Sequence, residues 1–190
     1  MTAPAPRPTL SDVTWRPPLI ETERLVLRGY EPGDAPSILR YASDPEVTPF
    51  MAWDPCRNLD DVNGFLNGAI APHYEAYELD YALALRTAPD AAIGGLGACW
   101  DSRAHRVIHL GYILAKEHWG KGYMPEAVRA LVRRAFETTD VQRIFAPIFA
   151  ENVKSRRAAE KAGLSFEGVL RSNVEHQGRR WDQAIYAVVR

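Results

Sequence analysis

The stretch HWGKGYMPEA, residues 118–127, is the most informative part of this sequence. Gly120 and Gly122 flank one lysine, and they stand between a strand-like run and a helix-like run. Glycines that open a helix leave backbone N–H groups unpaired at the positive end of the helix dipole, and they carry no side chain that would block an oxyanion. Pro125 suits the first helical turn, where no N–H is needed. The stretch predicts a phosphate-binding turn, with a plain strand-to-helix connector as the alternative.

Two nucleotide-binding motifs use comparable turns. A Walker loop needs GxxxxGK[ST], whereas Lys121 is followed by glycine, so this motif is absent. A dinucleotide fingerprint needs GxGxxG after the first strand of a parallel unit. Here Pro125 takes the place of the third glycine, although Asp140 stands near the position of the ribose-binding acid. A dinucleotide-binding oxidoreductase is therefore a less favoured alternative.

Length and composition fit one α/β domain. The chain has 190 residues, of which 46% are hydrophobic, and 23 Lys and Arg residues oppose 24 Asp and Glu residues. This balance provides no broad basic field for nucleic acid, and no apolar run has the length of a signal peptide or membrane span. Cys56 and Cys99 show no metal-type spacing. We expect a cytoplasmic monomer or homodimer with no metal and no nucleic-acid or membrane partner.

Apolar patterning predicts seven strands, with a proline-rich, flexible or draped arm before them at residues 1–18 and a single domain at 19–190. The second, third and fourth strands are predicted to form an antiparallel meander with turns at Pro89–Asp90 and Asp101–Ser102. Pro147 predicts an edge, a bulge or a splayed position for its strand. The predicted strands are RLVLRGYE, LDYALALRT, AAIGGLGACW, VIHLGYILAK, RIFAPIFA, SFEGVLRSNVEH and WDQAIYAVV.

Helical spacing predicts helices at residues 34–41, at 58–75, after the glycine turn, and from Asn152 to a C-terminal cap at Gly163. The helix after the glycine turn is the most regular of them. Its apolar stripe comprises Met124, Val128, Leu131, Val132, Ala135 and Phe136.

Taken together, the motifs resemble the GCN5-related N-acetyltransferase (GNAT) superfamily, and within it the RimJ/RimL-like branch. The resemblance runs from LIETERLVLR near Leu19 almost to Arg190, and it includes HLGYILAKEHWGKGYMPEA, QRIFAPIFAENVKSRRAAEKAGLSFEG and HQGRRWDQAIYAVV. It implies an α/β (α+β) fold with a mixed, mostly antiparallel central sheet of about seven strands, flanked by helices, in which two central strands splay apart. It also implies acetyl-coenzyme A (acetyl-CoA) as donor and an amine acceptor, either a protein N-terminus or a small amine.

The resemblance also implies which residues hold the donor. Backbone groups near Ile113 and Leu114 would lie along the pantetheine arm. In the motif NxxSxxxxEKxG, Asn152 would bond the pantetheine region and Ser155 would lie near the sulfur, although both residues also suit helix capping. Lys161 would face a phosphorylated adenosine. The pyrophosphate would be received by the amides of Trp119, Gly120, Lys121, Gly122, Tyr123 and Met124.

Direct acetyl transfer requires a neutral amine, oxyanion stabilisation and a proton for the departing thiolate. An amide near Ile113 or Leu114 would polarise the carbonyl, and Ser155 is the candidate proton donor to sulfur, with water assistance as the alternative. His109 stands where relatives often carry Glu, and an imidazole with a pKa near ~6.5 can accept an amine proton.

A structural role is the alternative for His109, and Glu117, Glu175 or water are the other candidate bases. Glu117 also stands where the family pattern often has Gln or Arg. Residues 47–67 are predicted to form the acceptor-side wall, where Trp53, Tyr74 and Trp100 are either lining or core residues. A non-catalytic acyl-CoA sensor or interaction module is the remaining alternative.

Overall fold

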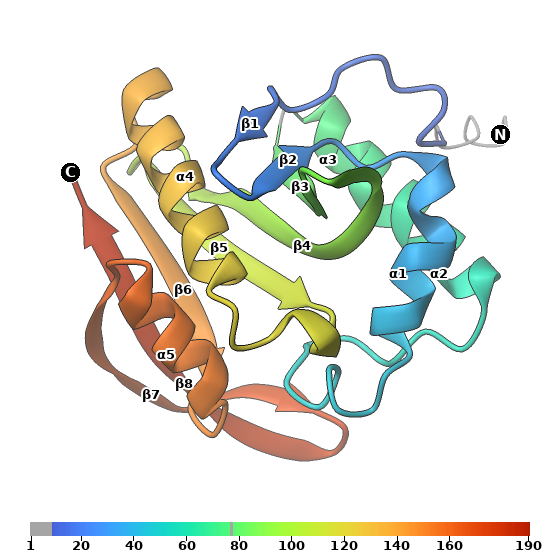
Figure 1. Cartoon of the computed structure of the whole chain (residues 1–190). Coiled ribbons are helices and arrows are strands. Elements are labelled where there is room, and N and C mark those ends of the chain that lie inside the picture. The colour runs from blue at the N-terminus through green and yellow to red at the C-terminus, as the bar shows by residue number, and fades with distance from the viewer. Residues whose placement is uncertain (1–8, 77) are drawn as a thin grey trace, which may run out of the picture.

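The computed structural model describes residues 9–76 and 78–190, and one eight-stranded sheet organises them (Figure 1). The strand order is β1-β2-β3-β4-β5-β6-β8-β7, and every neighbouring pair is antiparallel except β5 and β6. This confirms the mixed, mostly antiparallel sheet. The strands are β1 (Ile20–Glu21), β2 (Leu25–Arg28), β3 (Leu79–Leu85), β4 (Ala88–Ser102), β5 (Val107–Leu114), β6 (Arg143–Phe149), β7 (Ser165–His176) and β8 (Arg179–Val189).

Strand β1 is the one that the sequence pattern did not predict. It contains two residues and pairs with β2 through Ile20 and Leu27. Two residues are too few to show the period of two by which strands are recognised.

The meander of β3, β4 and β5 is confirmed, but its predicted turns are wrong. The chain reverses at Arg86–Thr87 and at residues 103–106, and both Pro89–Asp90 and Asp101–Ser102 belong to β4. Register shifts explain the first difference, because Ala84 pairs with Ala92 whereas Leu85 pairs with Ala88. Pro89 lies in the extra residues of this bulge, where the ladder does not require its missing N–H.

Strands β5 and β6 diverge, as Figure 1 shows. They pair only from Val107 to His109, whereas β4 accompanies β5 as far as Leu114. Pro147 comes after Phe145, the last residue of β6 that pairs with β5, and β8 continues to pair along the other side of β6. Of the three predicted positions, Pro147 thus occupies the splayed one. Its missing N–H is not needed there, because β5 has diverged from β6 at this point.

The helices pack on both faces of the sheet. One face carries α4 (Tyr123–Thr138) and α5 (Val153–Lys161), and the other carries α1 (Ala35–Ala42) and the predicted helix 58–75. The latter forms without interruption as α2 (Leu59–Phe65), a wider turn η2 (Leu66–Ile70) and α3 (Ala71–Glu75). Short 3-10 turns stand at η1 (Pro32–Asp34) and η3 (Lys116–His118).

The apolar stripe of α4 faces the core as predicted. Met124, Val128, Leu131 and Ala135 are buried, and Val132 and Phe136 pack half-buried against the same cluster. Gly163 follows α5 at φ +95°, which supports its predicted role as a helix terminator. No helix in the described ranges combines the length and the apolar character that a membrane crossing requires.

The described part of the predicted arm, residues 9–18, lies on the α1–α3 side of the domain. Leu10 is 0% exposed and belongs to the same apolar cluster as Tyr74. The guanidinium of Arg16 lies 5.3 Å from the centroid of the Tyr74 ring. These residues are thus draped on the domain, and residues 1–8 lie outside the described part.

Candidate functional site

The turn between β5 and α4 leaves backbone donors free. Gly120 and Gly122 have φ values of +74° and +80°, and Gly122 is the N-cap of α4. Within the described ranges, the amides of Gly120, Lys121 and Gly122 donate to no protein acceptor. The next amides belong to the first turn of α4, which has no intrahelical partners for them. A Cβ at Gly120 would meet nothing within 4 Å, so open space lies before these donors.

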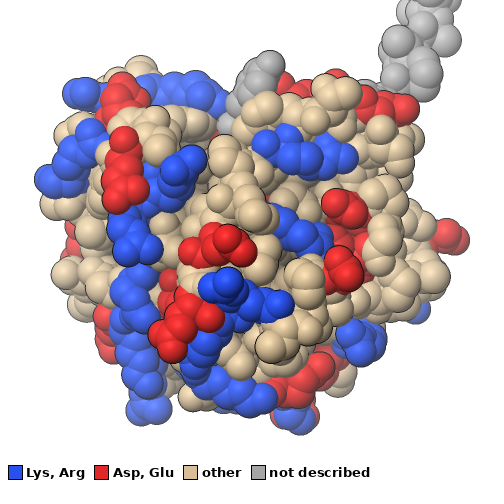
Figure 2. All heavy atoms as spheres, turned by 45° about the horizontal axis from the view of Figure 1, so that its top comes forward, with Lys and Arg blue, Asp and Glu red and all other residues tan. Residues whose placement is uncertain are grey.

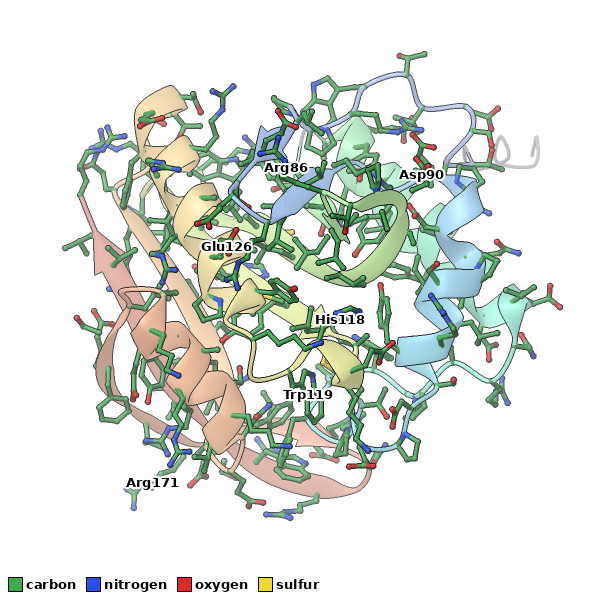
Figure 3. The ribbon with its side chains drawn as sticks, in the orientation of Figure 1. Arg86, Asp90, His118, Trp119, Glu126 and Arg171 are labelled. Atoms are coloured by element: carbon green, nitrogen blue, oxygen red, sulfur yellow. The ribbon has the colours of Figure 1, made fainter. Side chains whose placement is uncertain are left out.

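Trp119 departs from the prediction that its amide is also free. Its N–H donates to the carbonyl of Lys116 at 3.0 Å, because η3 ends there. Its indole Nε1 donates to the carbonyl of Leu114 at 2.7 Å, and Lys154 Nζ lies 4.2 Å from the ring centroid. Trp119 therefore closes the loop with its side chain and stands beside a cation of α5. Figure 3 shows Trp119 and His118 together at this connection.

Arg24 and Glu126 brace the same loop, and Figure 3 shows Glu126 on α4. Arg24 Nη1 donates to the carbonyl of Lys121 at 2.9 Å, and its Nε donates to Glu126 Oε2 at 2.7 Å. Thr22 Oγ1 donates to Glu126 Oε1 at 2.6 Å. Burial raises the pKa of Glu126, but these hydrogen bonds outweigh burial and hold it below its ordinary value. The carboxylate is thus paired, and Arg24 turns the Lys121 carbonyl toward itself.

The register of β5 decides which of its amides face the gap. Ala115 N–H donates to the carbonyl of Ile93 at 2.8 Å, and antiparallel partners alternate between bonded and non-bonded pairs. Ile113, two residues earlier, therefore directs its N–H toward β4, which corrects the prediction of a donor-binding backbone there. The N–H groups of Tyr112 and Leu114 face the gap instead, so a donor contact there stays a prediction. Past His109 no β6 partner meets them.

Tyr112 and Ser155 join β5 to α5 across the gap. Ser155 Oγ donates to the Tyr112 hydroxyl oxygen at 2.9 Å, and that hydroxyl donates to the Ser155 carbonyl at 3.0 Å. Burial raises the pKa of Tyr112 to about 12. Asn152 Oδ1 accepts the Ser155 N–H at 3.0 Å, so Asn152 does cap the helix. The Ser155 hydroxyl consequently has a fixed direction at the gap.

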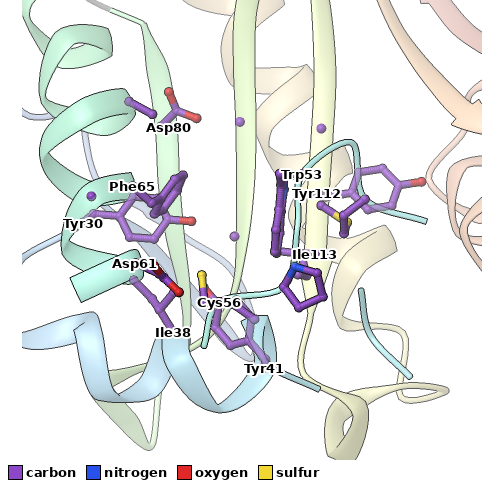
Figure 4. A pocket seen from close by; sticks show the side chains of 18 of the residues that line it. Tyr30, Ile38, Tyr41, Trp53, Cys56, Asp61, Phe65, Asp80, Tyr112 and Ile113 are labelled. Atoms are coloured by element: carbon purple, nitrogen blue, oxygen red, sulfur yellow. The ribbon is translucent and has the colours of Figure 1, made fainter. Parts of the chain in front are cut away.

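A cavity of about 1240 Å³ lies on the opposite face of the sheet, the one that carries α1 and α2 (Figure 4). Its floor is formed by β3, β4 and β5, and its walls by α1, α2 and residues 51–57. Trp53 lines it, within the predicted acceptor wall. Tyr74 is 0% exposed and belongs to the core, and Trp100 packs against Arg103, so neither lines the cavity.

The cavity wall is held against the end of the splayed strands. Phe50 lies 6.1 Å from Trp181 and 6.4 Å from Phe149, measured between ring centroids. Trp181 belongs to β8 and Phe149 to β6. The segment that walls the cavity thus contacts β6 and β8 at the end of the gap.

Comparison with known proteins identifies this arrangement. The family model of the acetyltransferase (GNAT) domain matches residues 24–165. The chain belongs to the GNAT family. It is similar to the uncharacterized N-acetyltransferase YoaA of Bacillus subtilis, with 28% identity over 91% of this chain and 97% of YoaA.

Two solved structures share the GNAT fold of this chain. One is the microcin C7 self-immunity acetyltransferase MccE in complex with acetyl-CoA and AMP, with a TM-score of 0.78, 22% identity, and coverage of 88% of this chain and 93% of MccE. The other is RimL, a ribosomal L7/L12 α-N-protein acetyltransferase in complex with coenzyme A, with a TM-score of 0.77, 19% identity, and coverage of 90% and 98%. The match to the GNAT family model and the likeness to YoaA show that the chain is an acyltransferase of the N-acetyltransferase type, which transfers acetyl groups to an amine.

Of the three candidate bases in this GNAT domain, only His109 lines the cavity. Glu117 is exposed on η3, and Glu175 pairs with Arg180 at 3.1 Å on the β7–β8 hairpin. His109 and Ile113 line the cavity, and Tyr112 both lines it and reaches α5 through its hydrogen bonds with Ser155.

Lys161 is exposed at the C-terminal end of α5, where its carbonyl accepts a hydrogen bond from Arg129. Lys154 lies seven residues earlier, about 10 Å along the helix, and it is the α5 cation that contacts the loop through Trp119. Lys161 as a phosphate contact stays a prediction. Lys154 was missed because nothing in a basic helix face indicates which lysine meets the loop.

Figure 2 shows basic and acidic side chains interspersed over the face that it presents. No wide surface of a single sign is visible there. That the GNAT domain has no nucleic-acid partner remains a prediction.

A cluster of His73, Asp80 and Cys99 borders the cavity floor. His73 Nδ1 lies 2.6 Å from Asp80 Oδ2 and 4.0 Å from Cys99 Sγ. Both partners address the same ring nitrogen, so this is no nucleophile–base–carboxylate triad, which uses both nitrogens. The hydrogen bond to Asp80, followed by that to Cys99, raises the pKa of His73 to about 10 against the effect of burial. The three ligand-type atoms lie within 4.8 Å of one another.

The His73–Asp80 pair makes stability depend on pH. Because the folded pKa of about 10 exceeds the unfolded value of 6.5, its contribution is complete below pH 6.5 and is lost as the pH rises through about 10. We expect the free energy of unfolding to fall more for the wild type than for His73→Gln over this range, by a modest amount since His73 is half-exposed. Urea unfolding at both ends of the range measures this. Equal losses in the two proteins would contradict it.

Proposed function

We propose that this GNAT enzyme transfers the acetyl group of acetyl-CoA to a primary amine that binds in the cavity, by direct attack in a ternary complex. One observation carries the proposal. The free amides at the N-terminus of α4 continue into the unpaired edge of β5, and β5 then presents His109 to the cavity. Strand β5 thus links three features: the candidate phosphate-binding turn after it, its own unpaired edge, and the candidate base His109.

The residues around the loop fit acetyl-CoA. A diphosphate requires donors and positive charge without steric obstruction. The loop offers the amides of residues 120–122, the open space before Gly120, the dipole of α4 and the cation of Lys154. The gap-facing N–H groups of Tyr112 and Leu114 suit the amide groups of a pantetheine arm, as in strand addition. The complex of MccE with acetyl-CoA supports this assignment.

Bound acetyl-CoA supplies an acyl thioester, whose C–S bond breaks as a C–N bond forms to the amine. His109 is in place to take the proton that the amine nitrogen must lose, since its side chain lines the cavity. The Ser155 hydroxyl lies at the gap, where it donates to Tyr112. To give a proton to the departing sulfur it would turn from Tyr112 to the sulfur, and Ser155 would then regain a proton from solvent. The gap-facing N–H groups of β5 would stabilise negative charge on the carbonyl oxygen.

The sequence left two alternatives to an acetyltransferase: a dinucleotide-binding oxidoreductase and an acyl-CoA sensor. The dinucleotide-binding oxidoreductase is wrong, because β5–β6 is the only parallel pair in the described sheet and the chain is a GNAT member. An acyl-CoA sensor would bind the donor without turnover, and the test below separates it from an enzyme.

The test is a product screen by mass spectrometry, with acetyl-CoA and a panel of peptides and small primary amines. We expect an N-acetylated product and an equal amount of free coenzyme A with at least one amine. A thermal shift with acetyl-CoA, measured in parallel, reports donor binding independently of turnover. Binding without any acetylated product would favour the sensor, and no binding would overturn the donor assignment.

A further inference from the structure

Asp80 stands at the cavity floor with one carboxylate oxygen unused. Its Oδ2 is held by His73 at 2.6 Å, whereas no group in the described ranges donates to its Oδ1. Asp80 is only 8% exposed, and it lines the cavity. Because Oδ1 is open to the cavity, it is free to accept a hydrogen bond from a donor that enters there.

Only glycine residues lie between Asp80 and β5 along this line of paired residues. Asp80 pairs with Gly97 on β4, and Gly97 pairs with Gly111 on β5. Asp80 Oδ1 lies 2.5 Å from the position that a Cβ of Gly97 would take, so the carboxylate leans from β3 over β4. A Cβ at Gly111 would meet nothing within 4 Å. Figure 4 shows Asp80 on its strand among the residues that line the cavity.

The distance along this path limits the length of the acceptor. Neighbouring strands lie ~4.8 Å apart. Because the Asp80 carboxylate lies over β4, its Oδ1 is within about 5–7 Å of the edge of β5 that faces the gap. An extended chain advances roughly 1.2 Å per bond. The hydrogen bond to Asp80 shortens this span by about 2.8 Å, and the approach of the attacking amine to a carbonyl in the gap lengthens it by about 3 Å. The two nitrogens would thus be separated by about four to six bonds.

The charges around the cavity favour a cationic group. Arg57 is the only Lys or Arg residue among the described lining residues, and it pairs with Asp61 at 3.1 Å. His73 balances one further carboxylate, that of Asp80. The acidic residues that line the cavity are Asp54, Asp60, Asp61 and Asp80.

We propose that Asp80, oriented by His73, anchors a second protonated nitrogen of the acceptor, so that the preferred substrates are diamines with about four to six bonds between their nitrogens. This proposal rests on the proposed function. The apolar walls, which include Phe65 and Trp53, suit the methylene chain between the two nitrogens.

The test compares 1,4-diaminobutane with 1-aminobutane, which have the same carbon chain and differ in the second nitrogen. A hydrogen bond to a charged group contributes about 1.5–3 kcal/mol, so we expect kcat/KM to favour the diamine by about 10–100-fold. In Asp80→Asn, which keeps the shape and removes the charge, this preference should fall about tenfold. Asp90→Asn is the matched control, because Asp90 is exposed on β4 outside the cavity lining (Figure 3), and it should keep the wild-type preference.

A second measurement uses the wild type alone, in case Asp80→Asn does not fold. Across diamines of increasing length, kcat/KM should reach its maximum at about four to six bonds. Equal rates with the diamine and the monoamine, a preference that Asp80→Asn preserves, or no maximum in that range would each overturn the role of Asp80. No acetylation of any amine or peptide would instead overturn the proposed function.

Discussion

Gly120→Val should weaken acetyl-CoA binding about 100-fold while the domain remains folded. Gly120 has a φ of +74°, at which a residue with a Cβ is strained by about 1–2 kcal/mol. The branched side chain would also fill the open space before the loop amides. Loss of two charge-assisted hydrogen bonds, at about 1.5 kcal/mol each, corresponds to roughly 100-fold in Kd. Isothermal titration calorimetry with acetyl-CoA measures the change.

Gly178→Val is the matched control for strain. Gly178 has a φ of +69° in the β7–β8 turn, and a Cβ there would also meet nothing within 4 Å. Both variants should lose similar stability in thermal unfolding, but only Gly120→Val should lose affinity. Unchanged affinity in a folded Gly120→Val protein would remove the diphosphate from this loop.

Local patterns made most of the fold predictable. The stripe of α4, the terminator Gly163 and the alternation of the meander strands each depend on residues a few positions apart, so they are visible in one sequence. The turn predicted at Pro89–Asp90 was wrong because strand pairing overrides local turn chemistry. The bulge that takes Pro89 into β4 depends on the register between Ala84 and Ala92.

The candidate site divides in the same way. The glycine turn was predicted from contiguous residues, but the backbone direction at Ile113 depends on the register between β4 and β5, which the hydrogen bond from Ala115 to Ile93 reveals. A shift of the register by one residue would turn every N–H of the strand to its opposite edge, and no sequence motif indicates which register forms. The pairing of His73 with Asp80 likewise arises because α3 packs against β3. Such contacts between elements are not encoded in the spacing of residues along the chain.

Ser155→Ala should lower kcat about 100-fold and change the Kd for acetyl-CoA little. A positioned proton donor contributes about 10²–10⁴-fold to rate, and the lower end suits a hydroxyl that water can replace in part. The helix start should persist, because Asn152 caps it through the Ser155 backbone N–H and not through the hydroxyl. Steady-state kinetics together with calorimetry separate the two effects. Ser165→Ala, at an exposed position that opens β7, should leave both quantities unchanged.

Tyr112→Phe distinguishes a proton donor at Ser155 from a purely structural serine. The Tyr112 hydroxyl accepts from Ser155 Oγ and donates to the Ser155 carbonyl, so its loss frees the serine hydroxyl to rotate. If orientation of that hydroxyl matters for turnover, Tyr112→Phe should lower kcat on its own but add little to Ser155→Ala, because neighbours in one network are not additive. Full activity in Ser155→Ala would leave water as the donor to sulfur. Independent, additive losses would mean that Tyr112 acts on the reaction by a route that does not pass through Ser155.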